Sequence, residues 1–496
     1  MTQLRMEKLS PSHAASWAEM VKSMPQQYEI GFARFGTTVD EVTASPQAAQ
    51  NHLEFRLRHS LQRKAHFLPQ MEFVALEKET IVGNLSLRLE LNSFLATMGG
   101  HIGYSVHPEH RNKGVASFLL NSTVKDLPKF GLKRVLITAN HDNLASLKVM
   151  EKAGAVYVDD FRTGKDHKKR VWISALETDS ALFEYSGLKD ALDWTKHYLS
   201  SEEAWQMGER EPYWPKWKTP WWQLCFLMEL GLIHHIPTFI LKRFSQSLDT
   251  HYQTFYLNSM EQCPTGCDPD LDFYCHCSLA TAMNILWEGG LDPLEGRDWL
   301  KDWLEKESLE AGGYNCAEGN KNRSPSFAST AAMLELLNRL GAMGCGSWIN
   351  PLQLKASQWL VERNFVNQKS TGKPASEDFL NPVFPRAYFY DPLRGKLACL
   401  EALAQSFQVE EDWAKLRNQL ISDVLDQNNV LLNKDFEKSI LQENTLFPSE
   451  TKGTPLQRGP SLATPLLEAA LSQKVALKIL EAERGRVAML LGELGG

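Results

Sequence analysis

The 496-residue chain has no uninterrupted run of about 20 apolar residues, the length that a membrane-spanning helix requires. Its most apolar region, 224–241, is interrupted by Glu229, His234, His235 and Pro237, so we expect a buried helix there. The first residues, MTQLRMEKLS, lack the long apolar core of a signal peptide. We therefore expect a cytoplasmic protein without a membrane span.

Excess positive charge is also absent, because 53 Lys and Arg stand against 60 Asp and Glu, a net charge of −7. This balance argues against a nucleic-acid partner, which would normally meet a basic surface. Eight cysteines without regular spacing predict a reducing compartment rather than a disulfide framework. The 43% hydrophobic and 23% charged residues are typical of a folded globular chain, here of two to four domains.

Tryptophan and cysteine are scarce in the first part of the chain. Only Trp17 and Trp172 precede residue 180, whereas the other 12 of the 14 tryptophans follow it, and every cysteine lies at Cys225 or beyond. Strand and helix patterns alternate before this point, and long helical patterns dominate after it. The sequence therefore predicts a multidomain fold, with an α/β domain at 1–178 and an all-α domain at 185–496.

The first domain has a clear order of predicted elements. These are two strands within 71–92 joined by a polar turn at 77–80, a strand at 101–108, a helix at 115–131, a strand at 133–140 and a helix at 143–154.

The loop between the strand at 101–108 and the following helix has the pattern R-x-x-G-x-A, from Arg111 to Ala116. Backbone N–H groups without partners and a partial positive charge gather at a helix N-terminus, which suits a phosphate. Gly114 lets the backbone approach such a ligand because it carries no side chain. Alone the pattern is weak, since many surface turns contain R-x-x-G, and it differs from the common phosphate-loop and dinucleotide motifs.

With its surroundings, the segment resembles motif A of the GNAT N-acetyltransferase superfamily, and the resemblance spans about residues 5–175. It implies a mixed central sheet flanked by helices, with acetyl-CoA as the co-substrate. The acetyl-CoA pyrophosphate would bind the backbone of the loop and helix start, at Arg111, Asn112, Lys113, Gly114, Val115, Ala116 and Ser117. The preceding strand, at Ser105 and Val106, would pair with the pantetheine arm as an added strand does.

The strand at 133–140 and the helix after it resemble motif B of the same family, which flanks the thioester and pantetheine. The residues that this implies are Asn140, Asn143 and Ser146.

The segment GGHIGYSVHPEHRNKG, with Arg88, Leu91 and Asn92 before it, is similar to a bacterial GNAT subgroup. The chain departs from that subgroup with His107 where arginine is usual and Val115 where tyrosine is common. Neither change removes a backbone amide. The resemblance therefore implies a bacterial acyltransferase that moves an acetyl group to a primary amine of a small molecule or a peptide.

Such a transfer needs a base, because only a neutral amine attacks a thioester. His101 is our candidate for the catalytic base, since it begins the strand along the expected acceptor site; a structural role for this histidine is the alternative. Glu90 and Glu109 are further candidates for the base.

Many relatives supply the general acid from a tyrosine four residues before the motif B glycine, where this chain has Met150. Tyr104 and Tyr157 lie nearby in the sequence, but the sequence does not place either beside the sulfur.

The second domain contains recurring units of a glycine- or proline-bearing turn followed by an apolar helix, at 215–231, 273–290, 312–341, 384–404 and 458–473. They resemble the α/α toroid of terpene cyclases and protein prenyltransferase β-subunits, and FPRAYFYDPLRG resembles a segment of bacterial squalene-cyclase-like proteins. This toroid would select or recruit the acceptor. The alternatives are a ligand- or protein-binding toroid joined to a vestigial or sensory GNAT domain, and a toroid enzyme acting on an isoprenoid.

Two patterns in the second domain remain open. The acidic run at 268–272 is similar to a cyclase acid motif but is more typical of a solvated turn. Soft ligands follow one another at Cys263, Cys267, Cys275, His276 and Cys277. Their spacing lacks the paired C-x2-C motifs of common zinc modules, and ligands that are adjacent in the sequence rarely bind the same ion. We therefore expect buried cysteines and no metal, and the sequence gives no indication of the oligomeric state.

Overall fold

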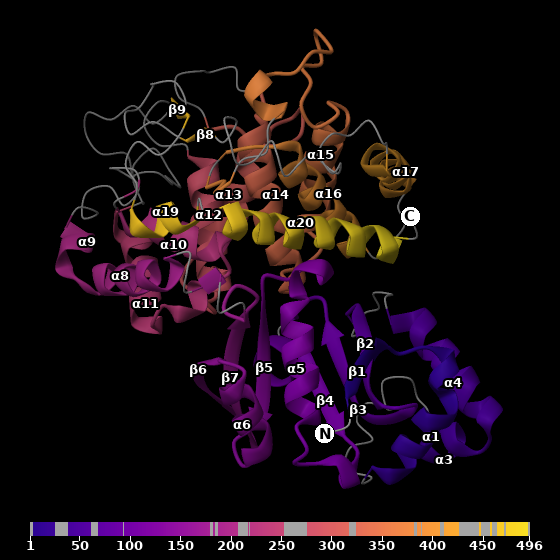
Figure 1. Ribbon diagram of the computed structural model, residues 1–496. Helices are drawn as coiled ribbons and strands as arrows, with labels where there is room; N and C mark the ends of the chain where they lie inside the picture. Colours follow the sequence, from indigo (N-terminus) through magenta and orange to yellow (C-terminus); the bar gives the residue numbers. More distant parts are fainter. Residues whose placement is uncertain are drawn as a thin grey trace. The chain divides into compact units, whose positions relative to one another are not determined.

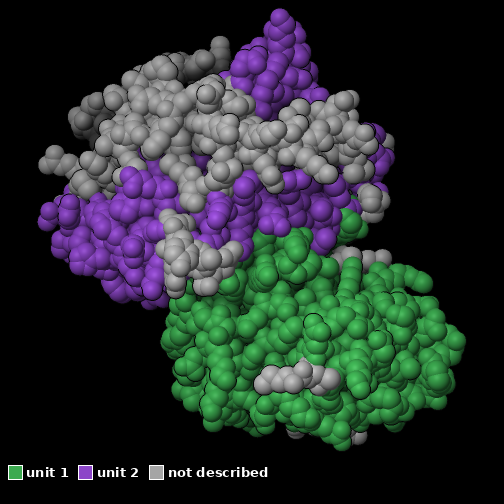
Figure 2. Space-filling model, viewed as in Figure 1, with its two compact units in different colours: residues 1–179, 492–495 green, residues 180–491, 496 purple. Residues whose placement is uncertain are grey.

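The computed structural model forms two compact units, residues 1–179 with 492–495 and residues 180–491 with 496 (Figure 2). It describes residues 3–24, 38–60, 68–92, 94–178, 182–183, 187–206, 217, 219–251, 275–316, 324–380, 384–387, 389–406, 411–425, 446–447, 457–458, 464–470 and 473–494.

The first unit is built on a seven-stranded mixed sheet of order β1-β2-β3-β4-β5-β7-β6, in which only the β4–β5 pair is parallel (Figure 1). Its strands are β1 Leu4–Lys8, β2 Gln70–Glu77, β3 Thr80–Arg88, β4 Ile102–Val106, β5 Arg134–Asn140, β6 Val156–Thr163 and β7 Asp166–Ser174. Its helices are α1 Ala14–Ser23, α3 Val39–Thr43, α4 Pro46–Ser60, α5 Val115–Lys125 and α6 Leu144–Lys152. The predicted mixed sheet with flanking helices is confirmed.

One predicted boundary is wrong. The helix expected over 115–131 ends at Lys125, and the chain continues as a 3₁₀ turn, Leu127–Phe130. Pro128 explains the difference, because it has no N–H to donate to the carbonyl four residues earlier and its ring clashes there.

Helices cover both faces of the sheet. Val115 and Leu119 of α5 pack on Gly83 of β3 so closely that a Cβ at Gly83 would lie 2.8 Å from Val115 Cγ1. On the other face, Arg56 of α4 forms an ion pair with Glu72 of β2 at 2.9 Å, and both side chains are buried. A buried apolar cluster joins α1, α3 and α4 to this sheet: Leu9, Ala14, Trp17, Ala18, Met20, Val21, Val42, Ala49, Leu53, Val74, Leu76 and Ile81.

The second unit is largely helical (Figure 1). Its helices are α8 Leu188–Ser200, α9 Glu202–Gln206, α10 Pro220–Glu229, α11 Thr238–His251, α12 His276–Glu288, α13 Trp299–Glu307, α14 Phe327–Ala342, α15 Ile349–Val361, α16 Pro392–Gln405, α17 Glu411–Leu425, α19 Pro465–Ala470 and α20 Gln473–Leu494. A short antiparallel pair, β8 Leu446–Phe447 and β9 Gln457–Arg458, is also present. Each recurring sequence unit contains a helix, namely α10, α12, α14, α16 and α19.

The core of the second unit runs through α10, α12, α14 and α16. In α12 every residue from His276 to Leu286 is buried, and α12 packs against α10 and α14, and α14 against α16. The intervening α13, by contrast, buries Leu300, Trp303, Leu304 and Glu307, which share one face at helical spacing. Buried helices therefore alternate with amphipathic ones along the chain.

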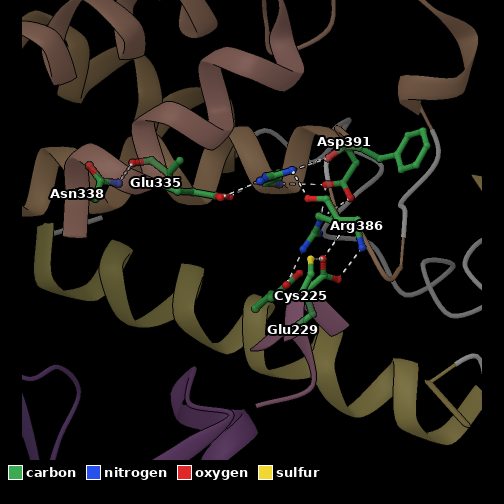
Figure 3. A network of polar contacts seen from close by, with 11 residues as sticks. Cys225, Glu229, Glu335, Asn338, Arg386 and Asp391 are labelled. Carbon is green, nitrogen blue, oxygen red and sulfur yellow. Dashed lines mark hydrogen bonds and ion pairs between the residues drawn. The ribbon is translucent and has the colours of Figure 1, made fainter. Parts of the chain in front are cut away.

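A buried network of charges joins distant parts of this unit, with Arg386 between Asp391 and Glu229 (Figure 3). Arg386 forms ion pairs with Asp391 at 2.8 Å and with Glu483 of α20 at 2.5 Å. Its backbone N–H donates to Glu229 of α10 at 2.6 Å. Because ions are costly to bury unpaired, these contacts fix the segment before α16 against α10 and α20.

No described helix is both long enough and apolar enough to cross a membrane.

We expect Arg386→Leu to lower the free energy of unfolding by about 3–5 kcal/mol, because Asp391 and Glu483 then remain buried without their cation. Urea unfolding followed by tryptophan fluorescence measures this loss. The matched control is Arg243→Leu, which breaks an exposed pair with Glu202 and should have a much smaller effect. Equal losses in the two variants would contradict the structural role of the network.

Candidate functional site

Strands β4 and β5 separate soon after they meet. Their ladder contains one bridged pair, Ile102 with Ile137, although β4 continues to Val106 and β5 to Asn140. On its other side β4 pairs with β3 along its whole length. The described sheet therefore has a gap between β4 and β5, where one edge of β4 is open to an extended ligand.

Beyond the gap, the chain turns into the N-terminus of α5. Asn112 and Gly114 have φ values of +59° and +84°, and residues 111–114 are exposed. Phe118 donates the first hydrogen bond of the helix, to the Gly114 carbonyl at 2.9 Å. The amides of residues 115–117 precede that bond and have no partner within the helix. A Cβ at Gly114 would meet no atom within 4 Å, so the backbone here is open to a ligand.

The side chains of Arg111 and His107 both form hydrogen bonds with the backbone of the loop region. Arg111 Nε donates to the Val106 carbonyl at 3.4 Å, which ties the loop to the end of β4. His107 Nδ1 accepts from the Glu109 N–H at 3.3 Å and caps the 3₁₀ turn. The departure from the subgroup at position 107 therefore leaves an ordered loop, in which Arg111 and Lys113 are both exposed cations.

The residues expected after β5 form the start of α6. Asn143 caps this helix, because its Oδ1 accepts from the Ser146 N–H at 3.1 Å, and its own N–H donates to the Asn140 carbonyl at 3.0 Å. The Asn140 side chain accepts from Lys168 of β7. These contacts hold the end of β5 and the start of α6 in fixed positions beside the gap.

Tyr104 lies on the side of β4 that faces the helices α5 and α6. It is opposite Leu85 in the sheet register, and its buried hydroxyl forms no hydrogen bond with the described residues. Burial raises the pKa of Tyr104 above its ordinary value, against the opposing effect of Ser146. The phenol therefore keeps its proton at neutral pH and can donate it.

The comparison with protein families decides which domain this is. Residues 3–156 match the family model described as the acetyltransferase (GNAT) domain. The first unit is a GNAT acetyltransferase domain. This match makes the chain an acyltransferase, and acetyl-CoA is the co-substrate that GNAT acetyltransferases use.

Solved structures similar to the chain align with about a third of it. The ribosomal-protein-S5-alanine acetyltransferase from Vibrio fischeri is 18% identical, with 35% of this chain and 94% of that chain covered and a TM-score of 0.27. A spermidine N-acetyltransferase chimera from Vibrio cholerae is 18% identical, with coverages of 36% and 98% and a TM-score of 0.26. A GNAT-family acetyltransferase from Streptococcus pneumoniae is 13% identical, with coverages of 35% and 99% and a TM-score of 0.24. No curated protein matches the chain.

In the GNAT domain, His101 joins three strands at the point where the gap begins. It is 6% exposed, and its Nδ1 accepts from the Leu136 N–H at 2.9 Å. Its own N–H donates to the Leu136 carbonyl at 2.7 Å, and its carbonyl accepts from the Arg88 N–H at 2.8 Å. The contacts give His101 a structural role. Because they occupy Nδ1, a neutral His101 carries its proton on Nε2, and its role as a base stays a prediction.

The other candidates for proton transfer lie in different environments. Glu109 is exposed and Glu90 is half-buried. Met150 is 1% exposed inside α6, while Tyr157 is 55% exposed on β6. Of the two tyrosines that the sequence left unplaced, only Tyr104 lies beside the gap.

The opposite face of β3 and β4 carries a half-open polar surface that the sequence did not point out. Asn84, Ser86 and Arg88 alternate with buried residues along β3, and Ser86 lies opposite Gly103. A Cβ at Gly103 would meet no atom within 4 Å. Behind this opening, the buried Glu72 carboxylate accepts from the Ser86 hydroxyl at 2.9 Å. The alternation of polar and apolar residues in VGNLSLRLE was the available signal.

We expect His101→Ala to destabilise the junction of β4 and β5 by about 1–3 kcal/mol, because the Leu136 N–H loses a buried acceptor. Hydrogen exchange of peptides that span β4 and β5 should become faster. In the control, His107→Ala removes a hydrogen bond at the exposed loop and should leave exchange in β5 unchanged. Unchanged exchange in His101→Ala together with lost turnover would instead indicate a catalytic base.

Proposed function

We propose that the protein transfers the acetyl group of acetyl-CoA to a primary amine of a small molecule or a peptide. The observation that carries this proposal is the gap between β4 and β5, which leads to the open backbone at Gly114. The pantetheine arm would pair with the edge of β4 at Ser105 and Val106. The pyrophosphate would then meet the loop and the first amides of α5, at residues 111–117.

In this arrangement the thioester lies between two chemically different surfaces. The polar surface with Ser86 and Asn84 offers oxygen atoms to the incoming amine, and Glu72, which is paired with Arg56, accepts from the Ser86 hydroxyl and holds it in place. Once the amine is neutral, its nitrogen forms a bond to the acetyl carbon while the carbon–sulfur bond breaks. A backbone N–H of β4 polarises the carbonyl, and the domain holds both reactants together.

The leaving thiolate takes its proton from Tyr104 in this proposal. The attacking nitrogen releases one proton to solvent as the amide forms, and solvent returns a proton to the phenol. The phenol is protonated at neutral pH and borders the gap, and its buried hydroxyl has no hydrogen-bond partner among the described residues. It takes the place of the tyrosine that many relatives carry where this chain has Met150. Because burial raises its pKa, Tyr104 stays a proton donor through the ordinary tyrosine value of about 10 and loses that role only at higher pH.

For the second unit we propose an α/α toroid that selects or recruits the acceptor, with domain limits of 1–178 and 185–496. The buried helices α10, α12, α14 and α16 alternate with amphipathic ones, which supports this architecture. In an α/α toroid the helices of the inner ring are buried, and those of the outer ring have one face exposed to solvent. We propose that the protein acts in a bacterial cytoplasm.

The other candidate function is a binding toroid with a vestigial or sensory GNAT domain. The buried Met150 favours it, because many relatives carry the tyrosine that acts as general acid at this position.

We expect Tyr104→Phe to lower kcat about 100-fold or more while acetyl-CoA binding stays unchanged, because the variant removes only the proton donor. The measurement is the release of CoA with the best acceptor from a panel of amines and peptides. In wild-type protein the fall of kcat at high pH should begin only above about pH 10, as the phenol loses its proton.

The matched control is Tyr157→Phe, which removes an exposed hydroxyl and should leave kcat unchanged. An unchanged kcat in Tyr104→Phe would contradict the assignment of the acid. No turnover of acetyl-CoA by the folded wild type with any amine would favour the binding toroid instead.

A further inference from the structure

Three cysteine thiols meet in the second unit, whereas the expected acetyl-CoA residues belong to the first. Cys275 immediately precedes α12, Cys277 is in its first turn, and Cys316 comes from the segment before α14. The sulfur of Cys277 is 3.7 Å from that of Cys275 and 3.3 Å from that of Cys316. All three sulfur atoms lie within 4.8 Å of one another.

These separations are those of metal ligands. A zinc ion binds cysteine sulfur at about 2.3 Å in a tetrahedron, which places two ligand sulfurs about 3.8 Å apart. A disulfide would bring two sulfurs to about 2 Å, so the three thiols are separate groups. A small inward or outward shift of each side chain suffices for all three sulfurs to contact one ion.

One sulfur of the cluster, that of Cys316, accepts hydrogen bonds from its surroundings. Cys316 Sγ accepts from the Cys277 N–H at 3.5 Å and from the Ser329 hydroxyl at 3.1 Å. The N-terminus of α12 adds its partial positive charge, which stabilises thiolates.

His276 and Glu307 complete the polar surroundings. The Nε2 of His276 lies 3.4 Å from Glu307 Oε2. Both side chains are buried, with 0% and 3% exposed.

We propose that Cys275, Cys277 and Cys316 bind one zinc ion. Each thiol releases its proton to solvent as its sulfur bonds to the metal, and no residue is oxidised or reduced. The three thiolates supply three of the four ligands that zinc takes. The ion would tie the start of α12 to the segment before α14, a role that acetyl transfer does not require.

The sequence pattern alone pointed to a different set of ligands. Cys263 and Cys267 lie outside the described residues, so their places are not part of the site proposed here. Cys316 was absent from the sequence pattern because it is 39 residues from Cys277. Only the fold brings these two sulfurs together, which is why the spacing argument predicted no metal.

The test uses the full chain, purified under reducing conditions and stripped of metal with a chelator. Titration with Co²⁺ should give the intense thiolate-to-cobalt absorption and the visible bands of a tetrahedral site, saturating at one ion per chain. Zn²⁺ should then displace the cobalt. Native mass spectrometry of the wild type should show one bound zinc.

Cys316→Ser should weaken Co²⁺ binding about 100-fold or more, because it removes a ligand. The matched control is Cys345→Ser, which removes a thiol outside the cluster and should keep the wild-type spectrum. If Cys316→Ser does not fold, Cys275→Ser repeats the test at the half-buried end of the cluster. No metal on the reduced, folded wild type, or an equal cobalt spectrum in the ligand variants, would overturn the proposal.

Discussion

The GNAT domain depends on the place where β4 and β5 stop pairing. The two strands meet at Ile102 and Ile137, and His101 strengthens that point with a backbone and a side-chain hydrogen bond to Leu136. If the ladder continued, the sheet would be closed and no ligand arm would fit beside β4. Because it ends there, the edge of β4 is left open and leads to the exposed backbone at Gly114.

The local elements of this domain could be predicted because short-range physics determines them. The turn between β2 and β3, the Asn143 cap of α6 and the glycine before α5 each depend on neighbours within a few residues. The early end of α5 follows from Pro128, which is also a local signal. The prediction of a longer helix gave more weight to the apolar residues at helical spacing than to this proline. The contacts of the site could not be predicted in this way, because they join residues that are distant in the sequence. The acceptor for the Leu136 N–H is His101, 35 residues away, and the pKa of Tyr104 in β4 is affected by Ser146, which lies in α6 beyond β5.

In the second unit, too, the helices could be predicted from the sequence but the contacts between them could not. Its helices follow from apolar periodicity, and each recurring unit contains one. The contacts that define it are non-local: Arg386 reaches Glu483 across 97 residues and Glu229 across 157. Neither pairing leaves a pattern in the sequence, because buried charges find their partners only when the helices pack. The cluster of Cys275, Cys277 and Cys316 arises in the same way.

The most direct test of the central claim is calorimetric titration of the protein with acetyl-CoA, compared with Gly114→Glu and Gly164→Glu. Both glycines have a positive φ and open space at the Cβ position, so the two variants add the same charge in the same region of backbone conformation, and of the two only Gly114 borders the proposed pyrophosphate site. We expect micromolar binding by the wild type and Gly164→Glu, and none by folded Gly114→Glu. Equal binding by all three, or no binding by the folded wild type, would contradict the proposed acetyl-CoA site.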